Sequence, residues 1–246
     1  MQVQAAIGAD IAFAFDELTT LNNTLDYQVM SLERTRLWAE RCIVEHDRLR
    51  SPDRPYQALY GVIQGAQYED LRRTAARDLG AMPFDGYGIG GAIEKRNLSD
   101  IVSWVTDGLP DDKPRHLLGI GEPGDLFAGV AAGADTFDCV SPSREARNSA
   151  VYTPDGRFNL LTSASRRAFA PIDAECDCYT CTHYTRAYLH HAFKAKEMIA
   201  STLATVHNIR FTVRLVDRMR EALERGDFDA LREDFLGRYY AGTASA

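Results

Sequence analysis

The chain has 246 residues, which suits one large domain or one domain with an appended subdomain. Its 45% hydrophobic and 26% charged residues are ordinary for a globular protein, and no apolar run approaches the length of a membrane-spanning helix. We therefore expect a cytoplasmic protein that has no contact with a membrane. The net charge of −7 argues against a nucleic-acid partner only superficially, because it divides into −9 for residues 1–140, +5 for residues 141–220 and −3 for residues 221–246.

Short apolar segments alternate with helical patterns through the first part of the chain. The predicted strands are residues 11–15, 59–63, 87–89, 116–120 and 136–140. The predicted helices between them are residues 27–46, 68–79, 98–105 and 125–132. This alternation predicts βαβ units and a parallel sheet.

Polar residues or glycines follow each predicted strand, at the end where an α/β barrel gathers its active site. About five strand–helix units are visible, whereas a closed (β/α)8 TIM barrel has eight. We therefore predict an α/β fold in which residues 1–142 form an incomplete TIM barrel. Because residues 1–8 have a helical pattern that leads into the first strand, we expect the chain to start within the domain, with an N-terminal portion missing.

The pattern changes after Pro142. Residues 151–161 contain Asp155-Gly156 and are typical of a β-hairpin. Helical segments follow at residues 186–196, 201–225 and 228–239, with Gly226 as a C-cap. We assign residues 143–246 to a C-terminal subdomain.

This subdomain contains three cysteines in one six-residue stretch, at Cys176, Cys178 and Cys181. His207 falls in the first turns of a predicted helix. Three thiolates and one imidazole make the tetrahedral ligand set that Zn²⁺ prefers in structural sites. A disulfide needs an even number of partners and an oxidising compartment, and nothing in the chain resembles a secretory signal. We predict one structural Zn²⁺ per chain.

Two carboxylates stand at predicted strand ends. Asp138 follows the last apolar strand, where it serves either as a helix cap or as a nucleophile that attacks a sugar anomeric carbon. Asp16 follows the first strand, where it serves either as a cap or as an acceptor for the paired N–H donors of a guanine-like base.

Two further segments carry polar or glycine-rich motifs. Residues 119–124 match G-x-G-x-x-G, but Glu122 would face the phosphates of a dinucleotide, so we expect a turn with Pro123 at the first helical position. Its backbone N–H groups suit a phosphate. Arg144 and Arg147 follow Asp138 closely, in either a solvated loop or a segment that contacts an RNA loop.

Together these residues resemble the bacterial tRNA-guanine transglycosylase (queuine tRNA-ribosyltransferase) family. The resemblance rests on Asp138-Cys139-Val140 with the two arginines, on Gln64-Gly65, and on the Cys-x-Cys-x-x-Cys motif with His207. It implies a zinc-bearing TIM barrel that exchanges guanine at wobble position 34 of tRNAs with a GUN anticodon. The incoming base would be 7-aminomethyl-7-deazaguanine (preQ1), a precursor of queuosine, and the reaction would pass through a covalent ribosyl-aspartate.

The resemblance also implies roles for individual residues. Asp138 would be the nucleophile, and Asp16, Gln64 and Gly91 would bind the base. The implied RNA-contacting residues are Gly119, Ile120, Gly121, Glu122, Pro123, Gly124, Asp125, Ser143, Arg144, Glu145, Ala146 and Arg147. The family's general acid/base aspartate would fall in the portion that we expect to be missing, and family members commonly form homodimers near the zinc region.

One departure from the family concerns the loop after the glycine pair. Many bacterial members continue with Leu-x-Val-Gly-Glu, whereas this chain reads Gly90-Gly91-Ala92-Ile93-Glu94 and is two residues shorter there. The aminomethyl group of preQ1 would then be recognised by Glu94.

The alternative function is a non-catalytic, zinc-dependent tRNA-binding partner subunit or an inactive fragment, and a third hypothesis is a nucleotide-dependent oxidoreductase built on residues 119–124.

Overall fold

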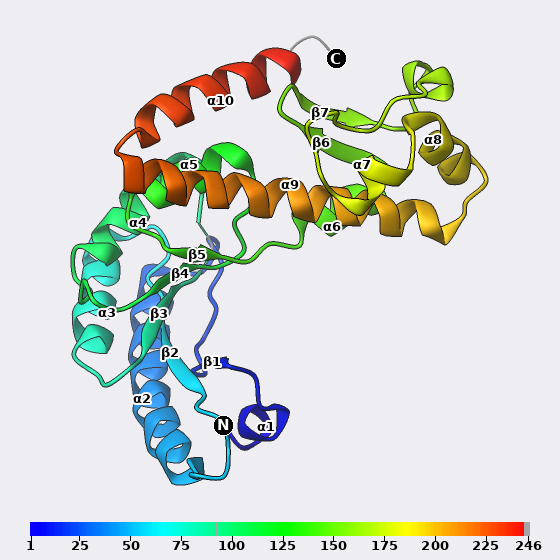
Figure 1. Ribbon diagram of the computed structural model, residues 1–246. Coiled ribbons are helices and arrows are strands. Elements are labelled where there is room, and N and C mark those ends of the chain that lie inside the picture. The colour runs from blue at the N-terminus through cyan, green and yellow to red at the C-terminus, as the bar shows by residue number, and fades with distance from the viewer. Residues whose placement is uncertain (92, 244–246) are drawn as a thin grey trace. The chain divides into compact units, whose positions relative to one another are not determined.

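Five parallel strands form a curled sheet in the order β1-β2-β3-β4-β5 in the computed structural model, which describes residues 1–91 and 93–243 (Figure 1). The strands are β1 (Ile11–Phe13), β2 (Ala58–Ile63), β3 (Gly86–Ile89), β4 (Arg115–Leu117) and β5 (Thr136–Phe137). The helices before and between them are α1 (Gln2–Ile7), α2 (Leu25–Leu49), α3 (Glu69–Gly80), the 3-10 helix η1 (Lys95–Asn97), α4 (Leu98–Thr106) and α5 (Pro123–Ala131). The predicted α/β fold with about five βα units of a barrel is confirmed.

The face of the sheet toward the helices is apolar. Alternate strand residues point to opposite faces of a sheet, and those on this face form one buried cluster with α2, α3 and α4. The strand members of the cluster include Ala12, Leu59, Ile63, Tyr87, Ile89 and Leu117. Full burial of a large apolar side chain contributes roughly 1.5–3 kcal/mol, so this cluster fixes which strand residues remain for the other, concave face.

Glycines on the concave face make room for two aromatic rings. A Cβ at Gly88 would lie 2.8 Å from the ring of Phe13, and one at Gly86 would lie 2.5 Å from the ring of Tyr60. The ring of Phe13 also reaches His116, with 5.6 Å between the ring centroids. The curl of the sheet therefore brings a side chain of β1 against one of β4.

Several strands are shorter than predicted. The segments expected at residues 11–15, 116–120 and 136–140 end at Phe13, Leu117 and Phe137. At β4 the reason is visible, because Gly119 has a φ of 76° that no extended strand can contain. In β4 the main chain thus leaves the sheet three residues before the predicted end, and the glycine-rich residues that follow lie on a loop.

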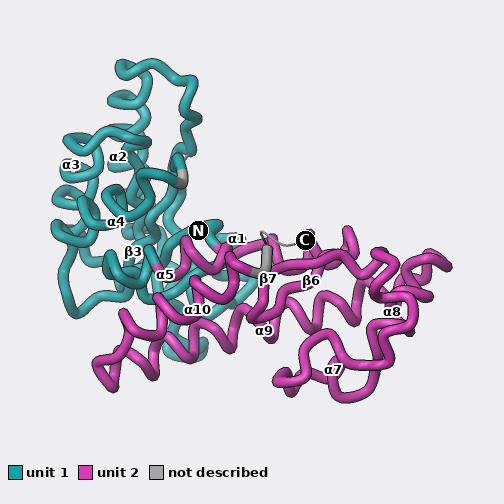
Figure 2. Tube along the Cα trace, turned by 90° about the horizontal axis from the view of Figure 1, so that it is seen from above, with its two compact units in different colours: residues 1–120, 128–138 teal, residues 121–127, 139–246 magenta. Residues whose placement is uncertain are grey.

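The chain clusters into two compact units (Figure 2): residues 1–120 with 128–138, and residues 121–127 with 139–246. The second unit contains α6 (Ser141–Arg147), β6 (Ala150–Thr153), β7 (Gly156–Asn159), the 3-10 helix η2 (Ser163–Arg167), α7 (Tyr179–His183), α8 (Arg186–Lys194), α9 (Met198–Arg225) and α10 (Phe228–Thr243). The predicted hairpin is confirmed as the antiparallel pair β6–β7, and Gly226 ends α9 with a φ of 78°. Our division of the chain after residue 142 stays a prediction.

Helix α9 is the central element of the second unit. Its buried residues recur at helical spacing and include Leu203, His207, Phe211, Leu215 and Met219. None of the described helices combines the length and apolar character that a bilayer crossing requires.

Candidate active site and metal centre

Asp138 lies directly after β5 on the concave face. Thr136 pairs with His116 in the sheet register, and Asp138 shares that orientation because it is two residues further along. Its Oδ1 accepts a hydrogen bond from the Gly119 N–H at 3.0 Å and lies 3.1 Å from Nε2 of His116. The side chain is 56% exposed, and its Oδ2 accepts no hydrogen bond from the described residues. One oxygen is therefore anchored and the other is available for reaction.

Asp16 and Gln64 form a hydrogen-bonded pair at the ends of β1 and β2. Nε2 of the buried Gln64 donates to Oδ2 of Asp16 at 2.6 Å. Oε1 of Gln64 has no partner within the described part of the chain. The pair thus offers carboxylate and amide oxygens side by side, an arrangement that suits a base edge with adjacent N–H donors.

Gly91, after β3, lies against this pair. Its φ is 98°, and an added Cβ would lie 2.7 Å from Oε1 of Gln64. Any side chain here would strain the backbone and fill the space beside the amide oxygen. Ala92, in the loop that we expected to be shortened, lies outside the described residues.

The side chain of Arg72 links the C-terminal ends of β2 and β3. This fully buried guanidinium donates from Nη1 to the carbonyls of Ile63 at 3.0 Å and Gly90 at 2.7 Å. Desolvation by burial lowers the pKa of Arg72 to about 10. Since Gln64 and Gly91 directly follow these two carbonyls, Arg72 fixes the backbone that carries both.

Sequence reasoning missed His116 and Arg72, although signals for both exist. Arg72 falls on the apolar stripe of α3 with Ala75, Ala76 and Leu79, which is an unusual place for a cation. His116 is the strand residue that pairs with Thr136, two residues before Asp138. Strand alternation combined with a guess of the register would have placed His116 beside the carboxylate.

The glycine-rich loop before α5 is closely packed. Pro123 is the first residue of α5, as predicted, and Asp125 lies in its first turn. A Cβ at Gly121 would lie 2.5 Å from Cβ of Cys139, and one at Gly124 would lie 2.6 Å from the hydroxyl of Tyr240. The backbone of this loop therefore has no room for larger side chains at its glycines.

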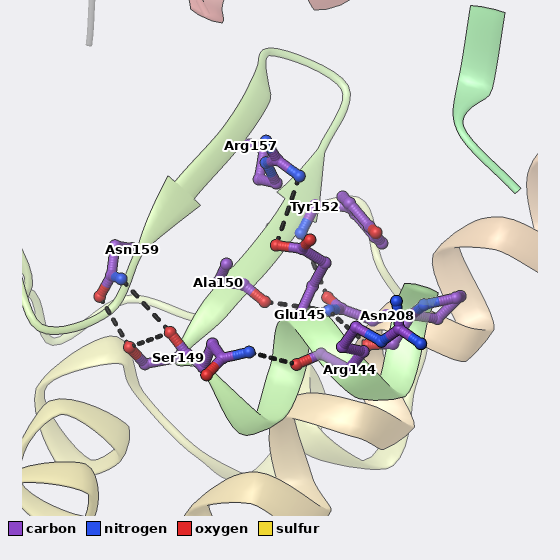
Figure 3. A network of polar contacts seen from close by, with 10 residues as sticks. Arg144, Glu145, Ser149, Ala150, Tyr152, Arg157, Asn159 and Asn208 are labelled. Carbon is purple, nitrogen blue, oxygen red and sulfur yellow. Dashed lines mark hydrogen bonds and ion pairs between the residues drawn. The ribbon is translucent and has the colours of Figure 1, made fainter. Parts of the chain in front are cut away.

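The short helix α6 contains the second predicted RNA segment (Figure 3). Arg144 and Arg147 are exposed, whereas Ala146 is buried. Glu145 forms an ion pair with Arg157 at 3.3 Å, and the hydroxyl of Ser143 donates to the main chain. Of the five predicted residues, the two arginines present positive charge to solvent.

Asn208 fixes the position of α6 in the second unit. Figure 3 shows its buried side chain between α6 and the hairpin. Its Nδ2 donates to the carbonyls of Pro142 and Ala150, both at 3.0 Å, and its Oδ1 accepts from the Tyr152 N–H at 3.2 Å. One amide thereby joins α6, β6 and α9.

The ligand atoms of Cys176, Cys178, Cys181 and His207 converge in the same unit. All four residues are buried, and their sulfur and nitrogen atoms lie within 4.8 Å of one another. Nδ1 of His207 lies 3.3 Å from Sγ of Cys181 and 3.7 Å from Sγ of Cys178. A tetrahedral ion about 2.3 Å from sulfur and about 2.0 Å from nitrogen needs edges of roughly 3.5–3.8 Å. The cluster can therefore hold a metal ion.

The surroundings orient these ligands for a metal. Nε2 of His207 lies 2.7 Å from the carbonyl of Tyr152, which assigns the proton to Nε2 and leaves Nδ1 facing the sulfurs. Burial by itself lowers the pKa of His207, but hydrogen bonds to Cys176 and Cys178 outweigh it and raise the pKa to about 9. Hydrogen bonds with Cys176 and Cys181 lower the pKa of Cys178, whereas hydrogen bonds with Cys176 and Cys178 raise that of Cys181. The sulfurs thus share protons, which a metal ion bound to thiolates would displace.

The cysteine loop is also tied to α9 by its other residues. Asp177 accepts hydrogen bonds from Arg210 at 2.8 and 2.7 Å. The buried hydroxyl of Thr180 donates to the carbonyl of Leu203 at 2.6 Å. The loop that bears three ligands is thus fixed to the helix that bears the fourth.

Comparison with known proteins agrees with this arrangement. The family model for queuine tRNA-ribosyltransferase matches residues 1–241. The chain is 45% identical over 245 residues to the queuine tRNA-ribosyltransferase of Symbiobacterium thermophilum, covering 98% of this chain and 60% of that protein. It is 43% identical over 242 residues to that of Bacillus subtilis, covering 97% of this chain and 62% of that protein. The chain thus spans less than two thirds of the length of these relatives, and it belongs to the queuine tRNA-ribosyltransferase family.

Proposed function

We propose that this chain is a tRNA-guanine transglycosylase, a pentosyltransferase that exchanges guanine at position 34 of tRNAs with a GUN anticodon for preQ1. The observation that carries the proposal is the exposed carboxylate of Asp138, anchored through Oδ1 by the Gly119 N–H and His116. A carboxylate held in this way is pre-oriented for attack on a sugar carbon. The names of these relatives support a tRNA substrate.

The covalent step follows from this geometry. Oδ2 of Asp138 forms a bond to C1′ of the ribose as the bond from C1′ to N9 of guanine breaks, and the electron pair leaves with the base. The departing guanine takes up a proton at N9. The incoming base gives up the proton of its N9, attacks C1′ from the vacated side and releases the carboxylate. Two successive displacements keep the ribose configuration.

Asp16, Gln64 and Gly91 would recognise the exchanged base. The carboxylate of Asp16 accepts hydrogen bonds from the donors of the pyrimidine edge, and Oε1 of Gln64 accepts a further one. A base that lacks these donors would leave buried acceptors unpaired, which is the usual origin of strong discrimination. Glu94, which forms an ion pair with Arg96, would bind the aminomethyl group.

The tRNA would be held by the predicted RNA segments. Arg144 and Arg147 supply exposed positive charge for phosphates or unstacked bases, and the loop at residues 119–125 supplies backbone N–H groups. The target nucleotide must leave its stack to reach Asp138. Such a substrate would place the protein in the cytoplasm.

We propose Zn²⁺, one per chain, as the ion of the Cys₃His cluster, since three sulfurs and one nitrogen match its preferred ligands. With four protein ligands the ion would keep no position for a substrate, so its role is structural. We also propose a homodimer that forms near this cluster. Its support is a group of contacting aromatic residues, Tyr179, Tyr184 and Tyr188, of which the first and last are exposed.

Exchange of radiolabelled guanine into a GUN tRNA tests the proposal. Asp138→Asn removes the nucleophile, and we expect the rate to fall on the order of 10⁴-fold or more. Asp111→Asn, which changes an exposed carboxylate elsewhere in the same unit, should leave the rate unchanged. Exchange that persists in the Asp138→Asn protein would rule out the nucleophile. A wild-type protein that binds tRNA without exchange would support the non-catalytic partner subunit instead.

A further inference from the structure

The imidazole of His116 bridges two residues at the end of β5. Its Nδ1 lies 2.8 Å from the hydroxyl of Thr136, and its Nε2 lies 3.1 Å from Oδ1 of Asp138. The side chain of His116 is 16% exposed, whereas that of Asp138 is 56% exposed. A histidine thus lies mostly buried behind a solvent-facing carboxylate.

The groups around the ring determine its hydrogen-bonding pattern. In the register, β3 offers Gly88 opposite His116, and β1 contributes the ring of Phe13. Neither carries a titratable group, so among these neighbours the charged partner is Asp138 alone. A neutral ring satisfies both contacts when Nε2–H donates to the carboxylate and Nδ1 accepts from the Thr136 hydroxyl.

We propose that His116 is a positioning residue for Asp138. The inference rests on the proposed function. With Gly119, the ring fixes Oδ1 so that Oδ2 is the oxygen that reaches the sugar. Two donors on one oxygen also prevent rotation of the carboxylate about its own axis.

Two substitutions test the hydrogen bond from His116 to Asp138. His116→Gln retains a neutral N–H donor near the position of Nε2, so we expect covalent adduct formation within about threefold of wild type at about pH 8. His116→Phe removes the donor, and we expect adduct formation to slow by about 10- to 100-fold with little change in the KM for tRNA.

The readout is the mass of a ribosyl adduct on denatured protein, measured as a function of time. Equal rates for wild type, His116→Gln and His116→Phe would overturn the inference. If wild-type protein forms no adduct, the proposed function fails, and a second measurement decides the inference. In ¹⁵N-histidine NMR spectra, we expect the Nε2–H tautomer for His116 and a changed Nε2 resonance in Asp138→Asn, while an Nδ1–H tautomer would overturn it.

Discussion

Asp138 and the Cys₃His cluster are held in place by different kinds of contact. Around Asp138 the sheet register, the Gly119 N–H and the buried Arg72 position residues that are far apart in sequence. In the cluster, three ligands lie within six residues, and four groups that share protons face a common centre. The first site should therefore keep its geometry without a ligand, whereas the second should depend on its ion.

Metal removal is expected to have the largest effect. Binding of a structural zinc is worth on the order of 10–16 kcal/mol of apparent free energy in small modules, and chelation removes it from the second unit. We expect release of about one Zn²⁺ per chain and loss of amide-exchange protection at Tyr152, whose carbonyl holds His207. Protection in β2 and β3 should persist.

A cysteine substitution provides the matched test. Cys181→Ser removes one ligand and should reproduce the effect of chelation, whereas Cys42→Ser changes a buried cysteine of the first unit outside the cluster. If chelation leaves the melting curve and the exchange pattern unchanged, the structural role is wrong.

The two sites also differed in how far the sequence predicted them. The cysteine ligands are close together in the chain, and His207 was found because helical spacing placed it within reach. Parallel strands expose their carboxyl ends at one edge, which placed Asp16, Gln64 and Gly91 together. The base-binding roles of Gln64 and Gly91 came from the family resemblance and stay a prediction. His116 and Arg72 were not predicted, because their contacts depend on the sheet register and on the orientation of α3, which local sequence patterns leave open.

Asn208 is the residue whose loss should most disturb the second unit while the metal is bound. Asn208→Ala leaves the Tyr152 N–H and the carbonyls of Pro142 and Ala150 without their partner. Each buried unpaired group costs about 1–3 kcal/mol, so we expect a loss of about 4 kcal/mol in the free energy of unfolding. Asn148→Ala, which removes one contact of an exposed side chain, should cost less than about 1 kcal/mol. Urea denaturation of both variants checks the difference.

Arg72 allows the corresponding test in the first unit. Arg72→Met removes the donors to the carbonyls of Ile63 and Gly90, and it also removes a buried charge that is costly to desolvate. We expect a net loss of about 3 kcal/mol together with weaker binding of guanine. Arg73→Met removes only the exposed pairs with Glu69 and Asp107 and should cost at most about 1 kcal/mol. Equal stability of the two variants would mean that Arg72 does not hold the strand ends.

The smallest effect is expected at the exposed ion pair between Asp155 in the hairpin turn and Arg238 in α10. Nε of Arg238 donates to Oδ1 of Asp155 at 2.6 Å, and this hydrogen bond lowers the pKa of Asp155 below its ordinary value. Because the pKa is lower in the folded state, the stabilisation is present above the unfolded-state pKa and is lost as the pH falls through the folded-state value. The side chain of Arg238 is 47% exposed and that of Asp155 is 68% exposed, so solvent screening limits the contribution of the pair to less than about 1 kcal/mol.

Arg238→Ala should therefore lower the free energy of unfolding slightly at neutral pH, and this difference should shrink as the pH falls through the folded-state pKa of Asp155 and the carboxyl becomes protonated in both states. Added NaCl at about 0.5 M should reduce the neutral-pH difference further. A difference that persists in acid would show that the alkyl part of Arg238 stabilises α10 by its contacts, and that charge is not the cause. With this outcome the hairpin would resemble the site around Asp138, where packing and main-chain hydrogen bonds set the geometry.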